Sequence, residues 1–108
     1  MANTFKSYAV KNVGTSAGTV YTCPSATQTT LIGLSMANTS ISPITTDAYI
    51  TRSAVNYYLV KGATVPVGGS LVIVGGDQKV VMQPSDILYI LNSAATSGDC
   101  FASLLEIT

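Results

Sequence analysis

The sequence predicts a single all-β domain spanning residues 1–108, built as a compact antiparallel β-sandwich or jelly-roll-like barrel of about eight strands. Apolar and polar residues alternate with a period of two along nearly the whole chain. β-Branched and aromatic residues gather in short runs that Gly, Pro, Asn, Asp and Ser separate. The length, 108 residues, fits one domain, and no helical periodicity competes. Several Greek-key strand orders fit this pattern.

The first two strands are expected at residues 4–13 and 19–23, with a Gly-rich turn between them. Pro24 ends the second strand, because proline removes a ladder donor and suits a strand end or a sheet edge. The longest alternation runs over residues 27–38. It predicts a strand with Ile32, Leu34 and Met36 on its core-facing side.

Two hairpins are expected in the middle of the chain. Residues 44–52 and 56–61 flank Ser53-Ala54-Val55. Residues 70–74 and 79–82 flank Gly75-Gly76-Asp77-Gln78, the strongest hairpin signal in the sequence, because paired glycines accept the positive φ of a tight turn.

The last two strands are expected at residues 86–92 and 100–107. The final one carries Phe101, Leu105 and Ile107 on one side.

Charge is the unusual feature of the composition. Only 9% of residues are charged and the net charge is zero, against about 25% charged residues in an ordinary domain. A protein without a basic face has no electrostatic basis for binding nucleic acid or an anionic membrane. No apolar run approaches the ~20 residues of a transmembrane helix. The N-terminus does not read as a secretory signal, so we expect synthesis in the cytoplasm.

The residues that enzymes use are scarce. The chain has no His, which removes the commonest general base and every Ser-His or Cys-His arrangement. We therefore expect no enzyme, no cofactor and no metal. Asp77, Asp86 and Asp99 lie in turn sequences, where they are expected to bond the backbone rather than calcium. Cys23 and Cys100 are expected to be free, buried thiols.

Few charges protect the strand edges. Uncharged β-prone segments aggregate when exposed, so we expect neighbouring subunits to cover them. Interface candidates are the residue types that dominate interface energetics: Arg52, Tyr57, Tyr58, Tyr8 and Tyr49. Tyr57 and Tyr58 point to opposite sheet faces, so at least one faces outward. Arg52 is the single arginine and the one side chain suited to a bidentate contact with a partner carboxylate.

Several segments resemble small virion structural proteins of tailed bacteriophages, especially cyanobacterial and marine phages. The segment from Thr19 to Asn38 resembles a "T-x-Y-T-x-P" opening followed by "T-x-I-x-x-L". The likeness continues through Tyr57-Tyr58-Leu59-Val60 and Pro66-Val67-Gly68-Gly69, and covers nearly the whole chain. The segment from Lys79 to Leu88 resembles the "L-x-x-G-D-x-I/L" turn of these proteins, with Ser85 where glycine is usual.

The resemblance implies a non-enzymatic building block of the virion, made in the host cytoplasm. The preferred interpretation is a capsid cement (decoration) protein that stabilises the major capsid protein shell. Such proteins commonly act as homotrimers at three-fold positions. Two alternatives stay open. One is a head-tail connector, tail or baseplate component, and the other is a receptor- or carbohydrate-binding β-sandwich, which would need a solvent-facing aromatic platform.

Overall fold

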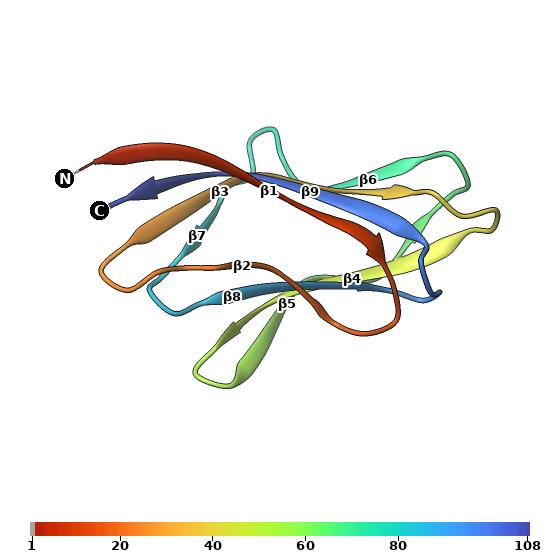
Figure 1. The fold of residues 1–108 in the computed structure, drawn as a ribbon, viewed down its shortest axis with the longest axis horizontal. Coiled ribbons are helices and arrows are strands. Elements are labelled where there is room, and N and C mark those ends of the chain that lie inside the picture. Colours follow the sequence, from red (N-terminus) through yellow and green to blue (C-terminus); the bar gives the residue numbers. More distant parts are fainter. Residues whose placement is uncertain (1) are drawn as a thin grey trace.

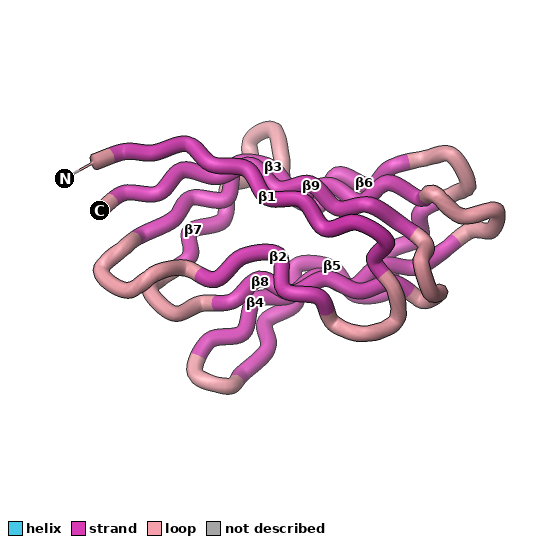
Figure 2. Tube along the Cα trace, viewed as in Figure 1, coloured by secondary structure: helices cyan, strands magenta, loops and turns pink. Residues whose placement is uncertain are grey.

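A computed structural model describes residues 2–108, and in this part of the chain every regular element is a β-strand (Figures 1 and 2). The predicted all-β sandwich is confirmed. The strands are β1 (Asn3–Val13), β2 (Gly18–Thr22), β3 (Gln28–Asn38), β4 (Ile44–Arg52), β5 (Val55–Val65), β6 (Ser70–Val74), β7 (Val80–Met82), β8 (Ile87–Asn92) and β9 (Gly98–Ile107). No helix in residues 2–108 is long and apolar enough to cross a membrane.

The strands form two antiparallel sheets that pack face to face (Figure 1). The five-stranded sheet has the order β1-β9-β3-β6, with β7 also paired to β3, and the four-stranded sheet has the order β2-β8-β4-β5. Strands that follow one another mostly lie in different sheets, as in a jelly roll of two Greek keys. The termini meet at one end, where Ala2 and Thr108 exchange backbone hydrogen bonds of 3.1 and 3.0 Å. As Pro24 indicated, β2 stops at Thr22 and is a sheet edge.

The core lies between the sheets and is built from alternate residues of the facing strands. β8 is a clear example, because Leu88 and Ile90 are fully buried while Ile87, Tyr89 and Leu91 on its other side are half-buried. The largest buried side chains come from both sheets. They include Leu31, Leu34, Met36, Ile44, Met82, Leu88, Ile90 and Leu104.

The hairpin predicted around Ser53 is present. β4 pairs with β5 through Arg52 and Val55, so Ser53 and Ala54 form a two-residue turn. Their φ angles are 54° and 63°, as a type I′ turn requires. β5 runs on to Val65, beyond the expected end, and its other edge has no strand partner among the described residues.

The hairpin predicted around Gly75-Gly76 is wrong. A turn does form there, with Gly76 at φ 61° and the Gln78 amide donating to the Gly75 carbonyl. However, β6 and β7 do not pair with each other. Both pair with β3, β6 along Leu34–Ala37 and β7 along Thr29–Leu31. The 11-residue β3 is long enough to hold the two short strands end to end.

The core face predicted for β3 is wrong at Ile32. The register with β9 shifts between Leu31 and Gly33, which is a β-bulge that inserts one residue. Leu31 and Leu34 are therefore both buried, and Ile32 lies on the outside of the five-stranded sheet. Alternation holds again from Leu34 to Met36.

Candidate interaction surfaces

Three tyrosines form a row across the outer face of the four-stranded sheet. Tyr58, Tyr49 and Tyr89 are register partners on β5, β4 and β8. The Tyr49 ring centroid lies 5.0 Å from that of Tyr58 and 5.4 Å from that of Tyr89. Lys61 Nζ lies 4.7 Å from the Tyr58 centroid, within the range of a cation–π contact. Burial raises the pKa of Tyr49. Two of the sequence candidates, Tyr49 and Tyr58, thus belong to one surface, the tyrosine row.

Tyr57 points to the other side of β5, as predicted, and both adjacent tyrosines are exposed because the β4–β5 hairpin reaches past the core (Figure 1). Tyr57 lines a cleft between the edges of the two sheets, with a volume of about 250 Å³. The other lining residues are Ile50, Arg52, Tyr58, Leu59, Val80 and Val81. We call this surface the hairpin cleft.

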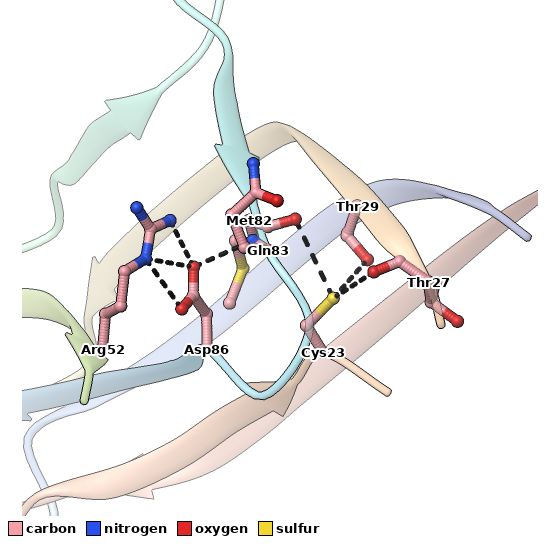
Figure 3. A network of polar contacts seen from close by, with 7 residues as sticks. All are labelled: Cys23, Thr27, Thr29, Arg52, Met82, Gln83 and Asp86. Atoms are coloured by element: carbon pink, nitrogen blue, oxygen red, sulfur yellow. Dashed lines mark hydrogen bonds and ion pairs between the residues drawn. The ribbon is translucent and has the colours of Figure 1, made fainter. Parts of the chain in front are cut away.

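Arg52 makes its bidentate carboxylate contact within its own chain rather than leaving it free for a partner. Figure 3 shows the guanidinium against Asp86, with Nε donating over 2.9 Å to Oδ1 and Nη2 over 2.5 Å to Oδ2. The Gln83 amide also donates to Asp86, which is buried. The Arg52 bonds hold the pKa of Asp86 below its usual range. The contact expected across an interface instead ties the hairpin to the turn before β8.

Tyr8 lies at the opposite edge, on β1, away from the other candidates. Its ring packs on Tyr21 of β2, with centroids 5.2 Å apart. The buried Tyr21 hydroxyl donates to Glu106 over 2.5 Å and contacts Thr29 over 2.8 Å, and Lys6 pairs with Glu106 at 3.0 Å. The Tyr21 bond and the Lys6 charge hold the pKa of Glu106 low, while burial raises that of Tyr21. Tyr8 therefore covers this edge of the sandwich, above a cluster of polar side chains that bond one another.

The outer face of the five-stranded sheet was not among the candidates, yet among the described residues it carries the most exposed aromatic side chain. Phe5 is 76% exposed and Phe101 53%. Val72 and Val81 are exposed on the same side. Phe101, Leu105 and Ile107 do share a side of β9, as predicted, and that side faces outward, since Cys100, Ala102, Leu104 and Glu106 are buried. We call this surface the five-stranded face.

Both cysteines are free and buried, as predicted. Cys23 Sγ lies within hydrogen-bond range of Thr29 Oγ1 and the Thr27 and Met82 carbonyls (Figure 3). Burial raises the pKa of Cys100 to about 12. Neither thiol has the electropositive, accessible setting of a reactive cysteine.

The three turn aspartates do not meet. Asp86 bonds the Gln83 amide and Asp99 bonds the Asn12 amide, so these two hold backbone as expected. Over residues 2–108, no group of three or more His, Cys, Asp or Glu could hold a metal ion.

Comparisons with known proteins show a likeness of fold alone. No protein-family model and no curated protein matches the sequence. A chain from a solved structure of Bacillus endospore appendages, described as a novel family of disulfide-linked pili, is similar in structure, with a TM-score of 0.59 and 16% identity. The match covers 98% of this chain and 88% of that one. At this identity the two chains share a sandwich architecture, and shared architecture does not carry function.

Proposed function

We propose that the protein is a non-enzymatic structural subunit of a tailed-phage particle, and specifically a capsid cement protein that binds the major capsid protein shell. The observation that carries the proposal is that large apolar side chains are exposed on more than one surface. Phe5, Val72, Val81 and Phe101 lie on the five-stranded face, while Val55, Tyr57 and Tyr58 lie on the β4–β5 hairpin. A subunit that touches several neighbours needs several such surfaces.

The hairpin cleft is the surface that we assign to the shell. It combines an aromatic anchor, Tyr57, with an apolar hollow, and a buried aromatic in a pocket is the usual centre of an interface. The Arg52–Asp86 contact fixes the turn end of the hairpin, so the surface is pre-organised and loses little conformational freedom on binding. If the protein binds the assembled shell but not the separate capsid subunits, its binding stabilises the shell by mass action.

A receptor- or carbohydrate-binding module is the second candidate, and the tyrosine row is the observation that bears on it. A sugar stacks on the open face of an aromatic ring. Here each ring packs against its neighbour, and Lys61 lies over Tyr58. The row is therefore better suited to stiffening the outer face of the sheet than to binding a sugar.

The test is to make particles that carry Tyr57→Ala and Tyr58→Ala together. Under the cement proposal, the particles lose resistance to heat or chelator. The matched control is Ile41→Ala, an apolar side chain that is 96% exposed in the loop before β4, away from the hairpin. Loss of host adsorption with particle stability intact would instead favour the receptor-binding role.

The expected trimer is tested separately, because it follows from the resemblance. Purified protein added to shells that lack it should bind in multiples of three per three-fold position. A six-fold or twelve-fold ring of the isolated protein, recognised by its symmetry in negative-stain electron micrographs and not by its mass alone, would move the proposal to a neck or tail component.

A further inference from the structure

We propose that the five-stranded face docks on the same face of a second copy of this chain, across a two-fold axis. This contact goes beyond the cement role and does not depend on it. Three properties of the face indicate that its partner is a second copy of the chain. They are the pattern of projecting and small side chains, the area of the face and its lack of net charge.

The relief comes from the register of the strands, which places the outward side chains in rows across the sheet. One row is bulky and consists of Phe5, Leu105, Thr30 and Val81. The next row is small and consists of Ser7, Ser103 and Gly33, with Ile32 beside it at the bulge. The third row consists of Ala9, Phe101, Ser35 and Val72.

The small side chains leave two hollows in this face. One, of about 370 Å³, is lined by Phe5, Ser7, Ile32 and Ser103 among others. The second, of about 300 Å³, lies around Ala9, Ser35, Ala37 and Phe101. Each hollow is therefore next to a projecting phenylalanine, so one face carries both the protrusions and the spaces that fit them.

A two-fold axis parallel to the sheet, running along the Ser7–Ser103–Gly33 row, brings these features together. Such an axis lays the first row of one copy over the third row of the other. Phe5 of each copy then meets the hollow at Ala9, and Phe101 meets the row that holds Leu105. At the axis, Ser7 and Ser103 meet their own copies, which lets β1 and β9 of the two sheets approach, and Ile32 at the bulge meets its own copy over β3.

The area is sufficient for a stable contact. Four strands abreast, each of about ten residues, span about 34 by 19 Å at the usual rise and strand spacing. The two copies together would bury about 1,300 Å², and stable interfaces bury about 1,200–2,000 Å².

Charge does not oppose the contact. Lys11 and Asp99, at one end of the face, neutralise each other at 3.0 Å. Lys6 and Glu106, on the same two strands, pair with each other, and the Glu106 carboxylate is buried. β3, β6 and β7 carry no charged residue. A face without net charge tolerates its own copy, whereas a charged one would repel it.

The test is the molar mass of the purified full-length protein by light scattering, at two concentrations roughly tenfold apart. We expect the mass of two copies, or of six where the three-fold contact also forms in solution. Phe5→Ser with Phe101→Ser should halve the mass while the circular dichroism spectrum stays unchanged, because both rings are exposed. Val55→Ser with Tyr58→Ser, the matched control on the hairpin, should leave the mass unchanged. A monomer or a trimer at both concentrations, or a mass unaffected by the Phe substitutions, would overturn the proposal.

A cross-link at the axis gives a second, independent readout. Ser103→Cys would place the one accessible thiol in each copy next to its symmetry mate, since Cys23 and Cys100 are buried. A short bis-maleimide should link it into a dimer, and Thr45→Cys on the outer face of the other sheet should stay monomeric on the gel. Equal linking of both variants contradicts the assigned face. Because neither assay contains capsid, failure here leaves the cement role standing, and failure to bind shells leaves the dimer standing.

Discussion

Asp86 is the residue on which the hairpin cleft depends. Its carboxylate accepts bonds from Arg52 and from the Gln83 amide, and it is 1% exposed. Asp86→Asn removes the charge and leaves the Arg52 guanidinium without its bidentate partner. We expect a loss of about 2 kcal/mol in the free energy of unfolding, measured by urea denaturation, because a hydrogen bond to a charged group is worth about 1.5–3 kcal/mol.

Asp99→Asn is the matched control for that loss. Asp99 also pairs with a cation, Lys11, but this pair is exposed, and exposed pairs are worth about 0–1 kcal/mol. A loss at Asp99 equal to that at Asp86 would show that burial does not set the value of the Arg52–Asp86 contact.

Ser85 occupies a backbone conformation that suits glycine. Its φ is 75°, in the left-handed region, and its side chain is exposed. The left-handed conformation costs a non-glycine residue about 1–2 kcal/mol, while glycine loses about 0.5–1 kcal/mol more chain entropy than alanine. Ser85→Gly should therefore raise the free energy of unfolding by about 0.5 kcal/mol, measured by chemical denaturation. Ser85→Val, which is stiff at this φ, should lower it; a stabilising valine would rule out the strain.

Burial at Cys23 and Cys100 gives a prediction about reactivity. With a pKa of about 12, Cys100 is almost entirely protonated at pH 8, and the thiolate is the reactive form. In the folded protein, neither thiol should react with Ellman's reagent. In guanidinium, which unfolds the protein, both thiols should react. Fast labelling of the folded protein would contradict the buried setting of these thiols.

At the scale of strands, the sequence is informative about where they lie and much less so about which faces they bury. Alternation is a local property, and it located all the strands to within a few residues. On β9, however, the outward side holds Phe101, Leu105 and Ile107, whereas the buried side includes Glu106. Alternation separates these two sets but does not reveal that Tyr21 and Lys6, from distant strands, satisfy the buried carboxylate.

Pairing is less predictable than the strands themselves. Gly75-Gly76 signals a turn correctly, but whether two strands pair depends on a third strand elsewhere in the chain. β3 offers an edge long enough for both β6 and β7, so each pairs with β3. The bulge at Ile32 also could not be predicted from local sequence, because it is defined by the register with β9, a strand distant in the chain. These two features shape the five-stranded face, which is why the sequence did not point to it.

Gly98 at the start of β9 tests how closely the strands pack. A Cβ there would lie 2.6 Å from Met36 Sδ, 2.8 Å from the Ala37 carbonyl oxygen and 2.8 Å from Asn92 Nδ2. Overpacking a core costs about 1–3 kcal/mol, so Gly98→Ala should lower the free energy of unfolding by about that amount. Gly14→Ala is the control, since its Cβ would make ordinary contacts of 3.5 Å and more. Equal effects at both glycines would mean that β9 can shift to make room.

For the whole molecule, acid is the condition that should unfold the sandwich. The pKa values of Asp86, Asp99 and Glu106 are all lowered by their partners, so each stabilises the fold above its unfolded pKa, near 4, and loses that contribution as the pH falls through its folded value. The sequence has no His, whose ionisation changes stability near neutrality in many proteins. We therefore expect the melting temperature, followed by circular dichroism, to be flat from about pH 8 to pH 5 and to fall below about pH 4.5.

Glu106→Gln should be less stable at pH 7 and show a shallower acid decline, because it has no charge to lose. A decline that begins above pH 5, or an acid limb that Glu106→Gln leaves unchanged, would mean that these carboxylates do not control the stability of the sandwich.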